Sequence, residues 1–101
     1  MLASMGRLEI RPEDRAALVD GRPLCLTMRE LQLLVTLSSH PQRIMTREEL
    51  FAAVWGGVPR SDDRSVDVYV SRLRAKLGEA LPGAHLIHTH NGIGYRFAPE
   101  G

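Results

Sequence analysis

The sequence predicts an α+β domain in which an N-terminal antiparallel sheet is followed by three helices and a C-terminal β-hairpin. Three observations lead to this fold class. Apolar and polar residues alternate near the N-terminus, two Thr-x-x-Glu capping boxes precede apolar stretches, and an Asn-Gly pair separates two short strand-like runs. The 101 residues suit one domain, covering 1–101, with a core of its own. Residues 1–6 are expected to be a disordered end or a remnant of the expression vector.

The composition is that of an ordinary globular protein and excludes several classes of protein. No apolar run approaches the ~18 residues of a transmembrane helix, and the N-terminus is not a secretory signal. The only cysteine, Cys25, excludes an internal disulfide framework, and its apolar neighbours predict that it is buried. These features predict a cytoplasmic location. The net charge of +1 gives little support to a nucleic-acid partner but does not exclude one, because the distribution of charge matters more than its sum.

Short strands are predicted before the first helix. Leu8 and Ile10 alternate with polar neighbours, which is the pattern of a half-buried strand. Asp20 and Gly21 form a hairpin turn signal between the apolar residues 17–19 and 24–26. This segment is therefore expected to fold as a small antiparallel sheet.

Two helices are predicted from their capping boxes. Thr27 with Glu30, and Thr46 with Glu49, have the spacing in which the hydroxyl and the carboxylate each satisfy a free backbone N–H. The first helix is expected to end before a Ser-Ser-His-Pro segment and the second at a Gly-Gly pair. The apolar faces of both helices are expected to lie in the core: Met28, Leu31, Leu34, Val35, Leu50, Phe51, Val54 and Trp55.

The segment 62–77, "DDRSVDVYVSRLRAKL", fits both a strand and a helix over its first half. Its alternation of β-branched and polar residues suits a strand of about six residues. At about 100° per residue, however, four large apolar residues share an arc of roughly 60°. These are Val66, Val70, Leu73 and Leu77. Because their pattern continues through the whole segment, we predict a third helix, capped by one of residues 61–63 and ended by Gly78.

The outward side of this predicted helix carries small, hydrogen-bonding and basic residues. Its centre consists of Arg64, Val68, Ser71, Arg72 and Ala75, with Ser65, Tyr69 and Lys76 on one flank and Asp67 and Arg74 on the other. Such a helix can lie in the major groove of DNA, where arginine binds guanine and small apolar groups touch thymine methyls. A solvated helix face with scattered charge explains the same residues equally well.

Three segments, in this order and spacing, resemble the OmpR/PhoB-type winged-helix domain, the C-terminal DNA-binding domain of two-component response regulators. They are "TMRELQLLVTLSSHPQRIMTREELFAAVWG", "DDRSVDVYVSRLRAKL" and "THNGIGYRF", and the resemblance runs from about Leu8 to Phe97. It implies a winged helix-turn-helix with a four-stranded N-terminal sheet, three helices and a C-terminal β-hairpin wing. It also implies that the third helix enters the major groove of double-stranded DNA and that the wing reaches the adjacent minor groove or the backbone.

The resemblance assigns a set of DNA-contacting residues to this chain. By position they are Arg64, Ser65, Tyr69, Ser71, Arg72, Arg74, Lys76, Thr89 and Asn91, to which the helical wheel adds Val68. Arg74 lies beside Asp67 on the wheel, so it is either a phosphate contact or an intramolecular partner of Asp67. Trp55 falls where the family often packs an aromatic residue near a phosphate, although a role in the core fits equally.

The wing departs from the family pattern Thr-Val-Arg-Gly-x-Gly-Tyr. In residues 89–95, Asn91 stands in place of the usual arginine, and His90 stands in place of a hydrophobic residue. These differences weaken the case for a strong electrostatic contact between the wing and the minor groove.

The resemblance also implies partners. The loop from Gly56 to Asp63 is far longer than that of a tight helix-turn-helix. In the family this loop can touch RNA polymerase, here through Val58, Arg60 and Ser61. The domain is expected to be monomeric alone and to pair head-to-tail on direct-repeat sites. In a full-length regulator a receiver domain and a sensor histidine kinase would be further partners, and no membrane partner is expected.

Other classes of function are less well supported. His85, His88 and His90 could suggest a metal site, but three ligands from one strand make poor geometry. No pair of nucleophile and base, glycine-rich phosphate loop or carboxylate dyad stands out, so neither an enzyme nor a cofactor is expected. The main alternative is a winged helix that contacts proteins instead of DNA. Steep salt dependence of binding to duplex DNA would separate the two.

Overall fold

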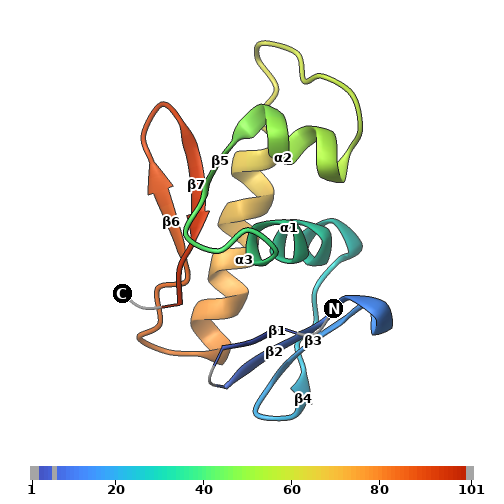
Figure 1. The fold of residues 1–101 in the computed structure, drawn as a ribbon, viewed down its shortest axis with the longest axis vertical. Coiled ribbons are helices and arrows are strands. Elements are labelled where there is room, and N and C mark those ends of the chain that lie inside the picture. The colour runs from blue at the N-terminus through green and yellow to red at the C-terminus, as the bar shows by residue number, and fades with distance from the viewer. Residues whose placement is uncertain (1–2, 6, 100–101) are drawn as a thin grey trace.

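A four-stranded antiparallel sheet forms one end of the molecule, and a three-stranded sheet lies beside the longest helix (Figure 1). The computed structural model describes residues 3–5 and 7–99. In chain order the elements are β1 (Ala3–Met5), β2 (Leu8–Arg11), a 3₁₀ turn η1 (Pro12–Asp14), β3 (Ala16–Val19), β4 (Arg22–Pro23), α1 (Met28–Ser38), β5 (Ile44–Thr46), α2 (Arg47–Val54), α3 (Ser65–Ala80), β6 (Ile87–His90) and β7 (Gly94–Phe97). The predicted α+β class and winged helix-turn-helix organisation are confirmed. No helix within the described residues is long and apolar enough to cross a membrane.

The N-terminal sheet has the strand order β1-β2-β3-β4, and each neighbouring pair is antiparallel. Asp20, with φ of 52°, and Gly21, with φ of 80°, form the turn between β3 and β4. Positive φ at both central residues matches the twist of the strands that such a turn joins. The predicted hairpin signal and the antiparallel sheet are therefore confirmed.

Two predictions about this region are corrected. Ala3–Met5 form β1, which pairs with residues 8–10, so a disordered end is wrong for this strand. Residues 1, 2 and 6 lie outside the described part of the chain. Cys25 is exposed rather than buried. The reason is that β4 ends at Pro23, so the chain has left the sheet before it reaches the cysteine.

The helices α1 and α2 begin at the two predicted capping boxes. The Glu30 N–H donates to Thr27 Oγ1 at 3.2 Å, and the Glu30 carboxylate accepts from the Thr27 N–H at 2.8 Å. The same reciprocal pair joins Thr46 and Glu49, at 3.1 and 2.9 Å. Both predicted helix starts are confirmed.

The predicted apolar faces of α1 and α2 are buried to different degrees. Leu31, Leu34, Leu50 and Val54 are buried, and Val35, Phe51 and Trp55 are half-buried. Met28 is 50% exposed, so its predicted place in the core is wrong. It is the first residue of α1, and burial along this helix begins only at Glu30.

The helix α3 confirms the helical interpretation of the ambiguous segment. The four apolar residues of the wheel are all buried: Val66, Val70, Leu73 and Leu77. The predicted cap within residues 61–63 is wrong, because Arg64 occupies the N-cap position and makes no side-chain cap hydrogen bond. Asp63, one residue earlier, accepts from the Ser65 N–H at 2.8 Å. The predicted end at Gly78 is wrong, because the helix continues to Ala80 and thereby brings Leu81 into the core.

The second sheet contains the predicted hairpin and one strand that the sequence did not indicate. Its order is β5-β7-β6, with antiparallel pairs. In the turn between β6 and β7, the Ile93 N–H donates to the His90 carbonyl at 2.9 Å, and Gly92 has a φ of 77°. The strand β5 has only three residues, placed between a turn and a capping box. Such a segment is too short to show the alternation that predicts a strand.

Gly94 is required where β5 meets β7. A Cβ at this position would lie 1.9 Å from the Met45 carbonyl oxygen and 2.8 Å from its carbonyl carbon. Because no ordinary nonbonded contact is that short, the two strands can pair this closely only around a glycine. This is the physical reason for the second glycine of the "GIGY" segment.

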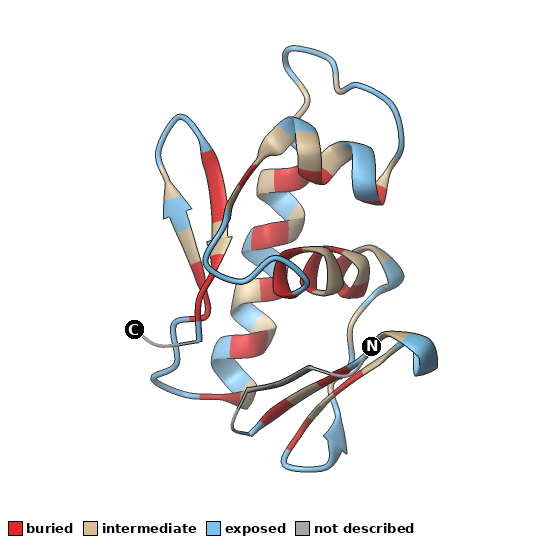
Figure 2. Cartoon of the chain, in the orientation of Figure 1, coloured by how far each residue is buried: buried red, intermediate tan, exposed pale blue. Residues whose placement is uncertain are grey.

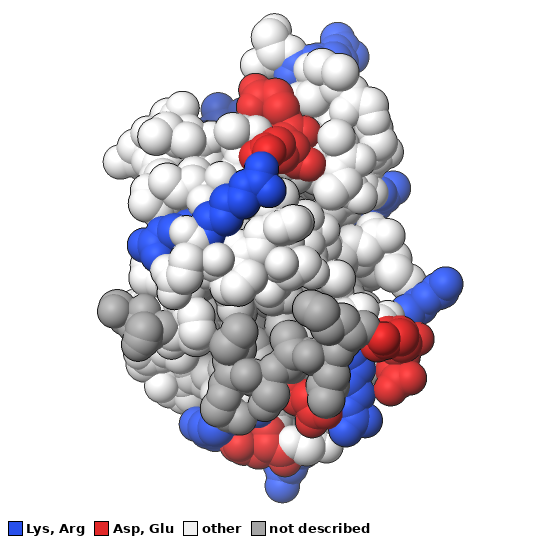
Figure 3. Space-filling model, in the orientation of Figure 1, with Lys and Arg blue, Asp and Glu red and all other residues white. Residues whose placement is uncertain are grey.

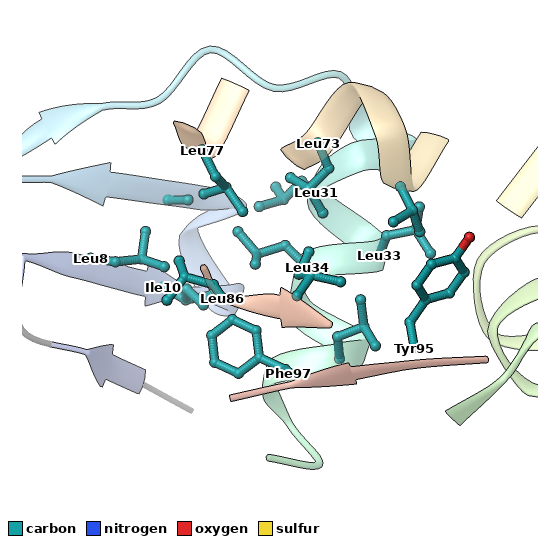
Figure 4. Close-up of a cluster of buried hydrophobic side chains, with 14 of the residues drawn as sticks. Leu8, Ile10, Leu31, Leu33, Leu34, Leu73, Leu77, Leu86, Tyr95 and Phe97 are labelled. Atoms are coloured by element: carbon teal, nitrogen blue, oxygen red, sulfur yellow. The ribbon is translucent and has the colours of Figure 1, made fainter. Parts of the chain in front are cut away.

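Both sheets and all three helices contribute to one core. Figure 4 shows Leu8 of β2, Leu34 of α1, Leu77 of α3 and Phe97 of β7 within this cluster. In Figure 2 the buried segments face inward, whereas the loop between α2 and α3 and the tip of the β6–β7 hairpin are exposed. The core therefore fixes which side of α3 faces inward and leaves the opposite side uncovered.

Candidate nucleic-acid interface

The side of α3 opposite the core is an exposed stripe. We call it the outer face, and it consists of Arg64, Val68, Ser71, Arg72 and Ala75, all exposed. Val68 is 42% exposed, so the stripe presents an apolar group among polar ones. In Figure 1, α1 lies in front of α3 and packs against it. The predicted placement of these five residues is confirmed.

One flank of α3 is tied to the wing and to the start of α2 through Asp67. Its carboxylate accepts from Arg47 Nε at 2.8 Å and from the Tyr95 hydroxyl, and Arg64 Nε lies 3.6 Å away. Burial alone would raise the pKa of Asp67, but the hydrogen bonds from Tyr95 and Arg47 outweigh it and lower this pKa. Asp67 is therefore ionised at neutral pH and fixes the position of the wing relative to α3.

Arg74 lies on the same flank and contacts the wing. Its Nη2 donates to the Thr89 hydroxyl, and its guanidinium carbon is 5.2 Å from the centre of the Tyr95 ring. Its Nε is buried and has no hydrogen-bond partner among the described residues. Of the two predicted roles of Arg74, pairing with Asp67 is wrong, because that carboxylate is already bound by Arg47 and Tyr95. A phosphate contact stays a prediction.

The other flank of α3 faces α1, and Lys76 pairs with that helix. Its Nζ is 2.6 Å from Glu30 Oε1, and Glu30 is only 1% exposed. Burial alone would raise the pKa of Glu30, but the hydrogen bonds from Lys76 and from the Thr27 N–H outweigh it and lower this pKa. The DNA contact predicted for Lys76 would leave the buried carboxylate without its counter-ion.

An aromatic cluster lies on the same side of α3, nearer its start. The half-buried Tyr69 ring meets Trp55 edge-on, with the ring centres 5.4 Å apart and the planes at 74°. Trp55 stacks on Phe51 at 5.4 Å, and the Arg29 guanidinium lies 5.5 Å from the Trp55 ring centre. Trp55 thus joins the three helices, and this packing favours the predicted core role over a phosphate contact.

Arg72 differs from the other basic residues of α3 because its donors are unused. Its guanidinium carbon lies 5.0 Å from the centre of the Tyr69 ring. In the described part of the chain it makes no hydrogen bond or ion pair. By contrast, Arg64, Arg74 and Lys76 each lie against an oxygen of another side chain. An exposed guanidinium with free donors can bind a base edge or a phosphate in bidentate fashion.

The tip of the wing is exposed and uncharged. Asn91 and Gly92 are exposed, and Ile93 is 52% exposed. Behind the tip, His90 Nε2 accepts a hydrogen bond from Arg96 Nε at 3.0 Å. The strand β6 also presents Thr89, which is exposed and holds Arg74.

The loop between α2 and α3 projects beyond both helices (Figure 1). Val58 is 86% exposed, and Arg60 and Ser61 are exposed as well. Gly56 and Gly57 have φ values of 85° and 80°, a conformation that favours glycine and turns the chain away from α2. The contact of this loop with RNA polymerase stays a prediction.

Away from the outer face, the charges of the protein are mixed. Figure 3 shows acidic and basic side chains next to one another on the α1 side of the molecule. Several arginines outside α3 are held in ion pairs: Arg7 with Asp20, Arg11 with Glu9, and Arg43 with Glu49. Among the residues that the structure describes, no three histidine, cysteine or acidic side chains form a group that could hold a metal ion.

The contacts that support the outer face were not identified from the sequence. Arg47 and Tyr95 both bind Asp67, from positions 20 and 28 residues away, and Lys76 binds Glu30 across 46 residues. No local pattern indicates pairs so far apart in the chain. The one available signal was Glu30 itself, which the capping box placed at the start of α1.

The fold and the uncovered face of α3 define a winged helix-turn-helix domain of the DNA-binding class. The family model described as "Transcriptional regulatory protein, C terminal" matches residues 21–97. The chain therefore belongs to this family, the OmpR/PhoB-type domains of response regulators, which are transcription regulators and not enzymes. The resemblance noted in the sequence is confirmed.

The chain is similar to several characterised members of the family. It is 37% identical over 96 residues to the phosphate regulon transcriptional regulatory protein PhoB of Pseudomonas aeruginosa, with 95% of this chain and 41% of PhoB covered. Klebsiella pneumoniae RstA, solved as its DNA-binding domain in complex with the RstA box, is 35% identical with a TM-score of 0.87 and 98% of both chains covered. The DNA-binding domain of Escherichia coli CpxR is 30% identical with a TM-score of 0.90, covering 100% of this chain and 99% of that one. The chain spans about two-fifths of the length of the curated relatives it matches.

Proposed function

We propose that this domain binds double-stranded DNA in a sequence-specific manner as part of a bacterial transcriptional regulator. In this proposal α3 lies in the major groove, and the β6–β7 wing approaches the adjacent minor groove or the backbone. The observation that carries the proposal is the outer face, where Arg72 has unused donors beside the exposed Val68 and Ser71. Arginine and small apolar groups on one helix face are the groups that distinguish bases in the major groove.

The candidate residues divide into four roles in this complex. On the outer face we assign base-edge contacts to Arg72 and Val68, and phosphate or base contacts to Arg64 and Ser71. Ser65, on the adjacent flank, is assigned a phosphate or base contact as well. Beside the wing, Arg74, Thr89 and Asn91 are assigned to the DNA backbone or the minor groove, because phosphate contacts set the register of a protein on the duplex. Lys76 is assigned to the fold, because its ammonium is already paired with the buried Glu30.

The family further suggests how the domain works in a cell. In a longer, cytoplasmic regulator it would follow a receiver domain that a sensor histidine kinase phosphorylates. It would be monomeric alone and would pair head-to-tail on direct-repeat sites. The exposed loop residues Val58, Arg60 and Ser61 would then meet RNA polymerase.

Duplex selection followed by a salt titration tests the proposal. Duplexes bound by the chain would be selected from a random library, and fluorescence anisotropy would compare a selected duplex with its scrambled version. We expect the selected duplex to bind at least about 10³-fold more tightly, with affinity falling steeply as salt rises. Equal, weak and salt-insensitive binding of both duplexes would overturn the proposal and favour a winged helix that contacts proteins.

A further inference from the structure

We infer that Tyr69 is a positioning residue that holds the Arg72 guanidinium ready for a base, and that its ring rather than its hydroxyl does this. The inference rests on the proposed function of α3 in DNA binding. It assigns to Tyr69 a role in specificity that differs from the direct DNA contact expected from its position in the sequence.

Tyr69 and Arg72 are close enough for their side chains to interact directly. The guanidinium carbon of Arg72 is 5.0 Å from the centre of the Tyr69 ring, within the range of a cation–π contact. The two residues are three positions apart on α3, a spacing at which side chains on a helix meet. Stacking on a ring face leaves the N–H groups of the guanidinium free, because they lie at its edge.

The Tyr69 ring is itself held in place. It meets the Trp55 ring in a T-shaped arrangement, and Trp55 in turn stacks on Phe51, so residues around the end of α2 support the ring. Arg29 of α1 covers Trp55 and donates to the Val54 carbonyl, which closes the cluster from the other helix. A ring fixed by three helices is a rigid platform for a flexible side chain.

In the part of the chain that the structure describes, neither side chain of this pair has a competing hydrogen bond. Within the described residues the Tyr69 hydroxyl has no hydrogen bond, and the Arg72 guanidinium has no partner except the ring. The ring is therefore the contact that restricts Arg72. Restricting a flexible side chain before binding reduces the entropy lost when it is ordered against one base.

This mechanism predicts an effect on specificity and little effect on general affinity. In a specific complex Arg72 must hold one geometry against a base edge. On random DNA it can reach a phosphate in many geometries, so pre-ordering contributes little there. Loss of the ring should therefore lower the ratio of specific to random affinity by about two- to tenfold, the cost of ordering one side chain.

The test compares three variants of the chain with the wild type on a selected duplex and on random duplex. Tyr69→Phe keeps the ring and should keep the wild-type specificity ratio. Tyr69→Leu keeps an apolar side chain against Trp55 but has no π face, so it should lower the ratio. In an Arg72→Ala background, Tyr69→Leu should lower the ratio no further. Thermal unfolding of each variant checks that the fold is retained.

A measurement without DNA separates this inference from the proposed function. In the free domain, NMR should show the Arg72 Nε–H resonance shifted by the ring current in the wild type and Tyr69→Phe, and unshifted in Tyr69→Leu. An unshifted wild-type resonance would overturn the inference whether or not the domain binds DNA. If Tyr69→Phe and Tyr69→Leu lose the same affinity for both duplexes, the inference is overturned in favour of a contact between the hydroxyl and a phosphate. The inference would also be overturned if the effects of Tyr69→Leu and Arg72→Ala on the specificity ratio were additive.

Discussion

The Asp67 carboxylate on α3 accepts a hydrogen bond from the Tyr95 hydroxyl on β7, and this contact joins the proposed recognition helix to the wing. Arg47, at the start of α2, donates to the same carboxylate oxygen at 2.8 Å. Three elements that are far apart in the chain therefore meet at one half-buried carboxylate. The orientation of the wing relative to α3 depends on this meeting point.

Tyr95→Phe should destabilise the domain without changing its fold. The change removes a hydrogen bond to a charged group but leaves Arg47 on the carboxylate, so we expect a loss of about 1–2 kcal/mol in the free energy of unfolding. Urea denaturation at pH 7 measures it. Tyr69→Phe is the matched control and should change this free energy by less than about 0.5 kcal/mol, because its hydroxyl has no partner in the described residues. Equal losses for the two variants would contradict the importance of the Asp67 contact.

The same variant should change how stability depends on acid. The pKa of Asp67 is lowered in the folded protein, so this group adds stability above about pH 4, its unfolded pKa. That stability is lost as the pH falls through the folded pKa. Removing the Tyr95 hydroxyl raises the folded pKa toward the ordinary value, so unfolding of Tyr95→Phe should depend less on pH below about pH 4.

Lys76→Met should destabilise the domain through the buried Glu30. Glu30 is 1% exposed, and without the ammonium 2.6 Å away its carboxylate lacks a counter-ion. We expect a loss of about 1–3 kcal/mol at pH 7, measured by urea denaturation. The pKa of Glu30 is lowered in the wild type, so its stabilisation is present above about pH 4.3 and lost at lower pH. The variant should therefore lose less stability than the wild type on acidification.

The second capping box provides a control for this prediction. Glu49 occupies the same position in α2 and pairs with Arg43 at 2.6 Å, but its side chain is 38% exposed. Arg43→Met should therefore lower the free energy of unfolding far less than Lys76→Met does, because solvent replaces the lost partner. The double variant Glu30→Gln/Lys76→Met should regain part of the free energy of unfolding that Lys76→Met alone loses, because no buried charge remains. No recovery in the double variant would show that the methionine itself disturbs the packing.

The fold could be predicted wherever its signals are local. Thr27 with Glu30 predicted the start of α1 from side chains within one turn, and the asparagine-glycine turn predicted the hairpin. The strand β5 could not be predicted, because its three residues form a strand only by pairing with β7, which lies some 50 residues further along the chain. Contacts of that kind depend on the assembled fold and leave no local pattern.

The candidate site, too, could be predicted only where its signals are local. The exposed position of Arg72 follows from helical period alone, since the buried Val70 and Leu73 fix the orientation of α3. The partners of the flanking side chains do not follow from it. The wheel offered Asp67 as a partner for Arg74, but in the structure Arg74 contacts Thr89 and Tyr95, because β6 and β7 pack along that flank.

Arg72→Ala should reduce specific binding more than general binding. If the guanidinium contacts a base, its removal should weaken the binding free energy by about 1–3 kcal/mol on a selected duplex and by less on random duplex. Fluorescence anisotropy on both duplexes measures the two losses. Arg22→Ala removes the same charge from the exposed strand β4 and should affect both duplexes only slightly. Equal losses on both duplexes would reduce Arg72 to a phosphate contact.

Changes in the loop between α2 and α3 should separate transcription from DNA binding. Val58 is 86% exposed and Arg60 is exposed, and neither lies on the outer face. We expect Val58→Ser and Arg60→Ala to lower transcription in vitro from a promoter carrying the binding site, while the affinity for that site stays unchanged. A drop in affinity as large as the drop in transcription would count against a contact between this loop and RNA polymerase.

Asn91→Arg should restore a charge at the tip of the wing. Asparagine can donate to an acceptor on an A·T edge or to a phosphate, but it releases no counterion on binding. An arginine at this exposed tip should tighten binding to both selected and random duplexes. It should also steepen the dependence of log affinity on log salt by about 0.9, the value for one phosphate. Asn91→Gln changes length without charge and should leave the slope unaltered. If Asn91→Arg changes neither affinity nor slope, the wing tip does not reach the DNA, and α3 carries recognition almost alone.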